Sequence, residues 1–115
     1  AAAAGDRFTV LRLVPGMDKA AQPLAQKVVK QTGLPVLVLA PDAEGGRVMA
    51  CAAVPEGVAA EGALQANAWL ASALSELGGK GGGRSTFAQG AGADAVKVGK
   101  AAEAAGEFAR VALLK

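Results

Sequence analysis

A run of apolar, mostly branched residues, Leu34–Ala40, limits the possible folds of this chain more than any other feature. The run has the length of a strand and lacks the apolar–polar alternation of a strand with one wet face. It therefore predicts a central strand that is buried on both faces. The turn-forming sequence Pro-Asp-Ala-Glu-Gly-Gly follows it, and Arg47–Val54 again has the character of a strand. Together the two segments predict a β-hairpin.

Segments on either side of this hairpin complete an α/β pattern. Arg7–Val14 alternates in part and predicts a first strand, and Ser85–Gln89 has the length of a short one. Apolar residues at helical spacing predict three helices: one that ends at Gly33, one over about Leu64–Leu77, and a last one capped by Asp94. We therefore expect one small α/β domain in the order β-α-β-β-α-(β)-α, with the helices packed on the sheet.

Residues with known capping preferences mark the ends of the first two helices. Asp18 is a candidate N-cap, but Pro23 would then remove a hydrogen bond, so the regular part of this helix is expected to start near Gln22. Gly33 and Gly78 stand where left-handed C-caps belong, because glycine adopts positive φ without strain.

The length of 115 residues is enough for one domain with a modest core. No stretch approaches the ~20 apolar residues of a membrane span, and the opening sequence AAAAGD lacks the features of a secretory signal. We interpret residues 1–6 as a frayed linker remnant and residues 7–115 as the domain. The net charge is only +2, so a nucleic-acid-binding surface would require local clustering of cations.

The chain contains no histidine, which removes the usual acid–base group, the histidine-activated nucleophiles and the imidazole metal ligands. Cys51 is the single cysteine, so an internal disulfide is impossible, and a small core residue is its expected role. Trp69 is expected to cover the edge of the core, with a base-stacking platform as the alternative. We expect no catalytic residue, no metal site and no cofactor in this chain.

The segment Gly78–Gly92, GGKGGGRSTFAQGAG, combines many glycines with two cations. Successive glycines can expose backbone N–H groups in a concavity that binds phosphate oxygens. Lys80 and Arg84 add positive charge on either side of the glycine triplet. The segment does not match the Walker pattern, and it follows a helix instead of opening one. From the residues alone, a flexible linker and an anion-binding loop are both open.

The sequence LGGKGGGRSTFAQGAG resembles the signature of the C-terminal, DHH-associated domain of alanyl-tRNA synthetases, in which Gly-Gly-Lys-Gly-Gly-Gly precedes Ala-Gln. The hairpin LVLAPDAEGGRVMACAAVP and the helix LQANAWLASALSELGGKGGG resemble the same domain, and the tryptophan is typical of its eukaryotic cytosolic branch. The resemblance covers about Leu34–Leu114, and the glycine stretch followed by Ala-Gln is its most specific part. Arg7–Gly33 fits the family in pattern only.

The resemblance implies a non-catalytic, tRNA-binding domain at the end of a multidomain alanine–tRNA ligase. Such a domain would contact the outer corner of tRNA(Ala) and let the aminoacylation and editing domains of the same chain share one tRNA. ATP, Mg and Zn are then implied for those other domains and not for this one. A homodimer and a cytoplasmic location are also implied, the organellar form being open, and no membrane partner is expected.

The predicted RNA-binding surface consists of glycine backbone, cations and one amide side chain: Gly79, Lys80, Gly81, Gly82, Gly83, Arg84, Gln89, Lys97 and Lys100. Gln89 would bind a base edge or a ribose, or would instead satisfy the backbone of its own loop. Lys97 and Lys100 lie one turn apart in the last helix and would extend the patch, or would simply form a solvated face.

Three other functions are compatible with the sequence. Related domains accompany DHH phosphodiesterases, but their loop usually continues Gly-Gly-Gly-His, whereas Arg84 stands at that place here. The alanine-rich last helix could pack against a second copy, which would make the domain a dimerisation module. The mild basicity would also permit binding of DNA in place of tRNA.

Overall fold

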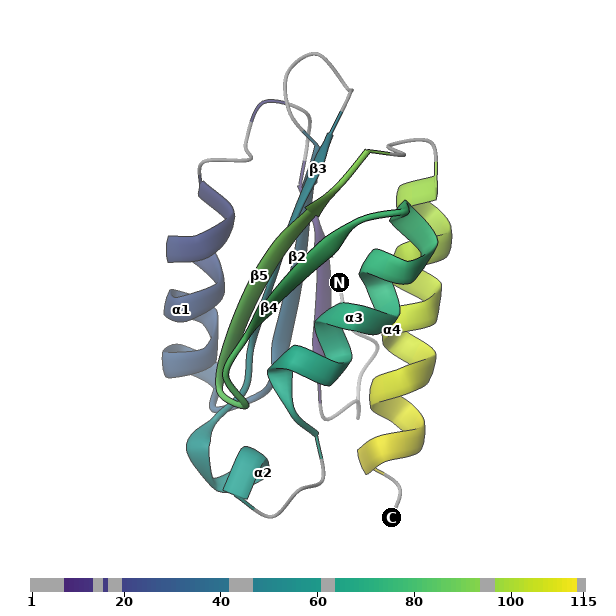
Figure 1. Ribbon diagram of the computed structural model, residues 1–115. Coiled ribbons are helices and arrows are strands. Elements are labelled where there is room, and N and C mark those ends of the chain that lie inside the picture. The colour runs from purple at the N-terminus through teal and green to yellow at the C-terminus, as the bar shows by residue number, and fades with distance from the viewer. Residues whose placement is uncertain are drawn as a thin grey trace.

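The computed structural model describes residues 8–13, 16, 20–41, 47–60, 64–93 and 97–113. In this part of the chain, helices lie on both faces of one five-stranded sheet (Figure 1). In chain order the elements are β1 (Thr9–Arg12), α1 (Ala21–Thr32), β2 (Val36–Pro41), β3 (Val48–Ala53), α2 (Glu56–Ala60), α3 (Ala66–Leu77), β4 (Lys80–Gly83), β5 (Phe87–Gly92) and α4 (Val98–Leu113). The predicted α/β class is confirmed. The predicted linker over residues 1–6 lies outside the described residues.

The strands follow the order β1-β2-β3-β5-β4 across the sheet. β1 is parallel to β2, with Thr9 opposite Val36, and α1 lies in the connection between them. The other neighbouring strands are antiparallel. The predicted hairpin is confirmed as β2–β3, in which Leu39 is opposite Ala50. Its predicted turn, residues 42–46, lies outside the described residues.

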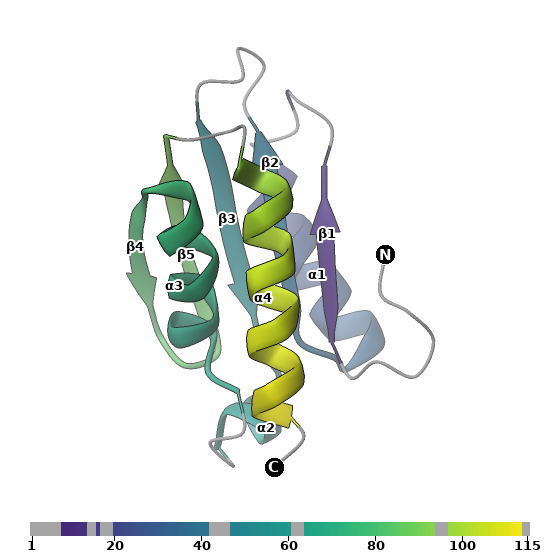
Figure 2. The same ribbon diagram turned by 90° about the vertical axis from the view of Figure 1, so that its right-hand side faces the viewer.

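The central strand β2 is buried on both faces, as its sequence predicts. Residues Val36–Ala40 are all 0% exposed. Leu37 and Leu39 belong to the larger core beneath α3 and α4, whereas Val36 and Val38 belong to a smaller core beneath α1. Figure 2 shows this layering, with α3 and α4 side by side in front of the sheet and α1 behind it.

The helix ends follow from glycine and proline at the expected places. Gly33 ends α1 with φ of 68° and Gly78 ends α3 with φ of 64°, so both predicted left-handed caps are confirmed. Pro23 lies in the first turn of α1, where backbone N–H groups have no intrahelical acceptor. The predicted N-caps Asp18 and Asp94 lie outside the described residues.

Trp69 lies inside the larger core, deeper than the core edge at which the sequence places it. It is 0% exposed, and its indole N–H donates to the backbone carbonyl of Ala105, 2.8 Å away in α4. Its ring meets Phe8 edge-on, with the ring centroids 6.2 Å apart. The hydrogen bond satisfies the buried donor and connects α3 to α4. A base therefore cannot stack on Trp69 in this structure.

Two segments differ from the secondary structure that the sequence predicts. The short helix α2, Glu56–Ala60, lies between β3 and α3, where the predicted element order has no helix. The glycine-rich segment forms a hairpin of β4 and β5, and β5 begins at Phe87, two residues later than predicted. None of the helices in the described residues combines the length and the hydropathy of a bilayer span.

Candidate functional site

The glycine-rich segment forms an edge strand instead of a concave loop. β4 pairs with β5 on one side only, with Gly82 opposite Gln89, and Gly81–Gly83 are exposed. None of Gly79–Gly83 has positive φ, so the expected concavity of successive N–H groups is absent. The segment is thus neither a flexible linker nor a concave anion-binding loop. Its free backbone N–H donors lie instead along the edge of a sheet.

The inward side of β4 explains why glycine is needed there. A Cβ atom added to Gly81 would lie 2.5 Å from the Cα atom of Gly90 and 2.9 Å from a methyl carbon of Leu74 in α3. A Cβ on Gly83 would lie 2.6 Å from the Cα atom of Ala88. These separations are far below van der Waals contact, so side chains at these positions would force β4 away from β5 and α3.

The outward side of β4 has no such restriction. A Cβ added to Gly82 would meet nothing within 4 Å. Because side chains alternate along a strand, Lys80 shares this side with Gly82. Arg84 follows the same register, since its N–H donates to the Phe87 carbonyl at 2.8 Å. Residues paired across a ladder share a face, so Phe87 and Gln89 of β5 lie on this side too.

We refer to the side of β4 and β5 that carries Lys80, Arg84, Phe87 and Gln89 as the open face. α1 packs on β2 and β3 and leaves the neighbouring part of the same sheet face uncovered. In Figure 2, α3 lies in front of β4 and β5, whereas α1 lies behind the other half of the sheet. The open face is therefore accessible to a large ligand.

The polar side chains of the open face are exposed and unpaired within the described residues. Lys80, Arg84 and Gln89 are all exposed. No carboxylate in the described ranges forms an ion pair with Lys80 or Arg84. Nor does any described backbone group form a hydrogen bond with the Gln89 amide, as it would if that side chain served its own hairpin. Their hydrogen-bonding capacity is directed to solvent.

The edge of β4 adds backbone donors to these side chains. In an antiparallel pair the hydrogen-bonded residues alternate, and the bond from Arg84 to Phe87 sets the phase of that alternation. Gly81 and Gly83 consequently direct their N–H groups away from β5, to the outer edge of the sheet. Both residues are exposed, so a phosphate oxygen can approach these donors closely.

Lys97 and Lys100 are exposed at the start of α4, which covers the opposite face of the sheet from the open face. Lys100 lies in a shallow hollow beside the carboxylates of Glu76, Glu103 and Glu107. These carboxylates offset its charge in any interaction with a polyanion. The structure therefore does not bring the two helical lysines together with Lys80 and Arg84.

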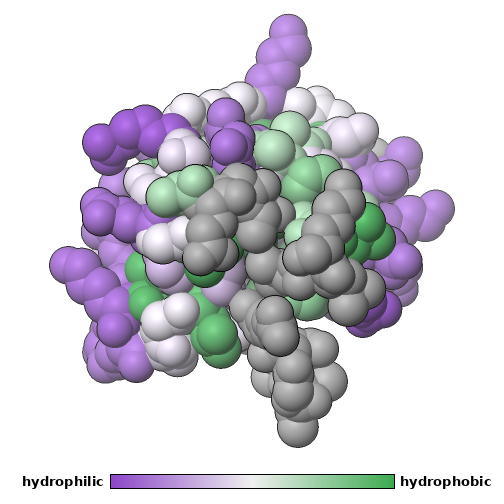
Figure 3. Space-filling model, turned by 90° about the horizontal axis from the view of Figure 1, so that it is seen from below, coloured by the Kyte–Doolittle hydropathy of each residue, from purple (hydrophilic) through white to green (hydrophobic). Residues whose placement is uncertain are grey.

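A hollow of about 490 Å³ at one end of the open face was missed by sequence reasoning. It lies between α1, the end of β3, and the turn that joins β4 to β5, and its lining includes Lys30, Glu56 and Phe87. Figure 3 views the molecule from this end, where hydrophilic and hydrophobic side chains both reach the surface. The available signal was the spacing of Phe87 and Gln89, two residues apart and hence on one face of a strand.

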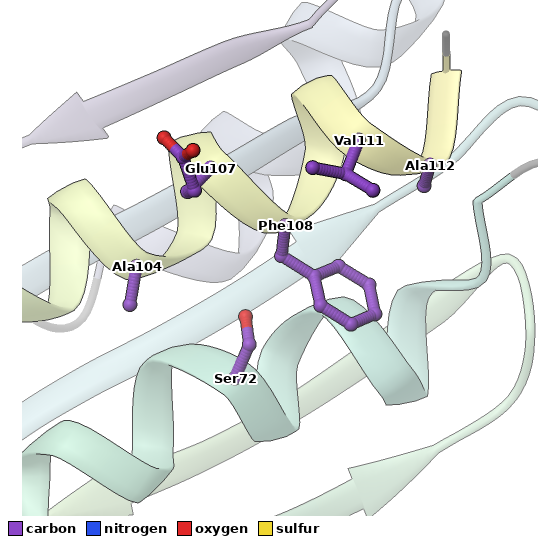
Figure 4. A pocket seen from close by; sticks show the side chains of 6 residues that line it. All are labelled: Ser72, Ala104, Glu107, Phe108, Val111 and Ala112. Atoms are coloured by element: carbon purple, nitrogen blue, oxygen red, sulfur yellow. The ribbon is translucent and has the colours of Figure 1, made fainter. Parts of the chain in front are cut away.

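A second hollow, of about 520 Å³, lies between α3 and α4. Phe108 and Val111 line it and are 37% and 53% exposed. Figure 4 shows the Phe108 ring reaching from α4 toward α3, close to Ser72. This apolar surface is on the covered side of the sheet, remote from the open face in the layer order of the fold.

Cys51 is a core residue, as predicted. It is 1% exposed on β3, beneath α1, and burial raises the pKa of its thiol to about 11. The thiolate, which is the nucleophile and the metal ligand, is thereby disfavoured. Within the described residues, no three histidine, cysteine or acidic side chains are grouped as a metal site would require.

Comparison with known protein families gives a match over most of the chain. The model of the family described as "DHHA1 domain" matches residues 5–111. The chain belongs to the DHHA1 domain family. It is 37% identical over 92 residues to "Alanine--tRNA ligase, cytoplasmic" of Dictyostelium discoideum. The aligned region covers 76% of this chain and 10% of that protein. The chain thus spans about a tenth of the length of this curated relative.

A solved structure gives an independent match of the fold. The crystal structure of the C-Ala domain from Aquifex aeolicus alanyl-tRNA synthetase superposes with a TM-score of 0.70 at 21% identity. The match covers 89% of this chain and 87% of that domain. The resemblance to the C-terminal domain of alanyl-tRNA synthetases, drawn from the glycine-rich signature, is confirmed by these comparisons.

Proposed function

We propose that this chain is a non-catalytic tRNA-binding module, the C-terminal domain of an alanine–tRNA ligase of the eukaryotic cytosolic type. The observation that carries the proposal is the open face, where Lys80, Arg84 and Gln89 are exposed together beside an edge strand of glycine. Its charges have no partner in the described residues, and the similarity to the cytoplasmic ligase supports tRNA as the polyanion.

In this proposal the backbone and the side chains have different tasks. The N–H groups of Gly81 and Gly83 would donate to phosphate oxygens, since they lie at the exposed outer edge of the sheet. Lys80 and Arg84 would supply the charge that attracts the RNA and displaces its counterions. Gln89 can both donate and accept, so it would contact a base edge or a ribose hydroxyl.

In the parent ligase this module, residues 7–115, would hold the outer corner of tRNA(Ala) and so connect aminoacylation with editing. A few phosphate contacts give only modest affinity, but a tether to the other domains raises the effective concentration of the module. We propose that binding here needs no cofactor, with ATP, Mg and Zn serving the other domains, and that the protein acts in the cytoplasm.

The test is a titration of the chain with a tRNA(Ala) transcript at several salt concentrations. Changing Lys80 and Arg84 together to Ala should weaken binding and reduce the salt slope by ~0.7–0.9 for each phosphate that the variant no longer neutralises. Lys100→Ala is the matched control, because Lys100 lies on α4 among carboxylates. If the double variant keeps both the affinity and the slope of the original chain, the hairpin does not bind RNA.

DNA is the alternative polyanion for the same face. Phosphate contacts do not distinguish the two nucleic acids, whereas a contact from Gln89 to a 2′-hydroxyl would favour RNA. Competition between duplex DNA and tRNA measures this preference directly. If a DNA duplex displaces tRNA at equal phosphate concentration, the ligand of the open face is DNA and not tRNA.

A dimerisation module is a second candidate, favoured by the apolar hollow at Phe108 and Val111. Exposed apolar surface of this kind occurs at contacts between protein chains. Sedimentation of the chain and of the Phe108→Ser variant over a range of concentrations separates the two functions. Self-association that the substitution abolishes would support a homodimer, and a monomer at every concentration would remove this candidate.

A further inference from the structure

The hollow at the end of the open face has walls of two kinds. Val29 from α1 and Phe87 from β5 are partly buried apolar residues of the smaller core, and Pro55 adds to the apolar wall. Lys30 and Glu56 are exposed polar residues at its rim. Such a hollow suits a ligand with apolar flat sides and a polar edge.

We propose that this hollow binds one unpaired nucleobase, with Phe87 as the stacking surface. The inference rests on the proposed function, because it places the base next to the phosphates held by the β4–β5 hairpin. The volume of about 490 Å³ is in the range of small-molecule sites. A phosphate would be repelled by the carboxylate of Glu56, whereas amino groups on a base edge can donate to it.

The register of the hairpin connects the hollow to the rest of the open face. Phe87 is opposite Arg84 across the ladder, and Gln89 lies about 7 Å further along β5 on the same face. Arg84 on one side and Lys30 on the other place positive charge beside the base, where the phosphates of the same strand must pass. One strand of nucleic acid can therefore meet all of these groups in sequence.

The shape of the hollow favours single-stranded or looped nucleic acid. α1 forms one side and the turn between β4 and β5 the other, so a base can enter only when it is turned out of a helix. A duplex presents only the edges of its stacked bases, which cannot reach the Phe87 ring. Stacking on an aromatic side chain is the usual way in which proteins bind unpaired bases.

The experiment uses an RNA heptamer with a central 2-aminopurine, whose fluorescence is quenched by stacking. Binding of the chain should quench it, and Phe87→Leu should abolish the quench and weaken binding by about 5- to 100-fold, the effect of removing one stacked base. Phe87→Tyr should preserve both signals, because the ring is kept. Phe108→Leu is the matched control on the far side of the sheet.

The outcomes distinguish this proposal from the proposed function. Loss of affinity in Phe87→Leu with an unchanged salt slope supports stacking, since every phosphate remains neutralised. If the heptamer binds, depends on Lys80 and Arg84, and is indifferent to Phe87→Leu, the base pocket is wrong while the RNA-binding hairpin stands. If neither the heptamer nor tRNA binds the unaltered chain, both proposals fail. Urea unfolding of each variant shows whether an affinity change reflects reduced stability.

Discussion

The two sides of strand β4 place opposite demands on the same residue type. On the inward side, Gly81 and Gly83 leave no space for a Cβ atom, because β5 and α3 lie against them. On the outward side, Gly82 has nothing within 4 Å. Packing thus explains the inward glycines and leaves Gly82 without a structural reason. The difference separates what the fold needs from what the open face offers to a ligand, and substitutions can test each side independently.

The largest effect is expected on the inward side. Gly81→Ala should lower the free energy of unfolding by about 3 kcal/mol or more, because the added Cβ atom would lie 2.5 Å from backbone that cannot move without parting β4 from β5. Urea unfolding followed by circular dichroism measures the change. A decrease below about 1 kcal/mol would show that β4 does not approach β5 and α3 so closely.

The next comparison is between two parts of one sheet face, the part that α1 covers and the open face beside it. Cys51 and Gln89 are partners in the β3–β5 ladder, yet α1 buries the first and the second is exposed. Burial raises the pKa of Cys51 from 9.0 to about 11. Below pH 9 the thiol is protonated in both states. Between pH 9 and 11 it ionises only in the unfolded chain, which should lower the free energy of unfolding by about 3 kcal/mol.

Stability measured from pH 8 to 11 in the original chain and in Cys51→Ala tests this directly. All other groups are common to both proteins, so the difference between the two curves isolates the thiol. The native thiol should also be inert to a disulfide reagent at pH 8, since the thiolate is the reactive form. Parallel curves and a rapidly labelled thiol would show that Cys51 is solvated.

Where side chains carried the signal, the sequence predicted the fold well. The unbroken apolar run at Leu34–Ala40 predicted burial on both faces of β2, and Gly33 and Gly78 predicted the helix ends. β4 could not be predicted in this way. A strand of glycines has neither the two-residue nor the 3.6-residue apolar period, and its pairing with β5 depends on close approach of backbones in three dimensions.

The candidate site divides in the same manner. Lys80, Arg84 and Gln89 could be proposed from the glycine-rich signature, but their common face follows only from the β4–β5 register. Phe87 was missed because an aromatic residue in a strand usually indicates core. It is only partly buried here because α1 packs mainly on β2 and β3. That extent of cover is a property of packing, which no local pattern encodes.

A smaller effect, of opposite sign, is expected in α4. Gly106, like the β4 glycines, lies inside a regular element. A Cβ atom there would meet nothing closer than Phe8 at 3.9 Å, which is an ordinary contact. Gly106→Ala should therefore stabilise the fold by about 1 kcal/mol through helix propensity alone. Thermal unfolding measures the gain. A destabilised variant would mean that α4 packs more tightly on the core than the structure has it.

The smallest change in stability is expected at Gly82, and it completes the comparison within β4. Gly82→Ala should alter the free energy of unfolding by at most about 0.5–1 kcal/mol, in the stabilising direction, because alanine has less freedom to lose in a strand and clashes with nothing. The same substitution adds a methyl group to the surface on which RNA is proposed to lie. Weaker tRNA binding at undiminished stability would show that Gly82 serves the ligand, whereas unchanged binding would confine the RNA contacts to the neighbouring cations and the edge amides. Measuring the free energy of unfolding and the tRNA affinity of both Gly81→Ala and Gly82→Ala thus shows which of two neighbouring glycines is needed for folding and which for binding.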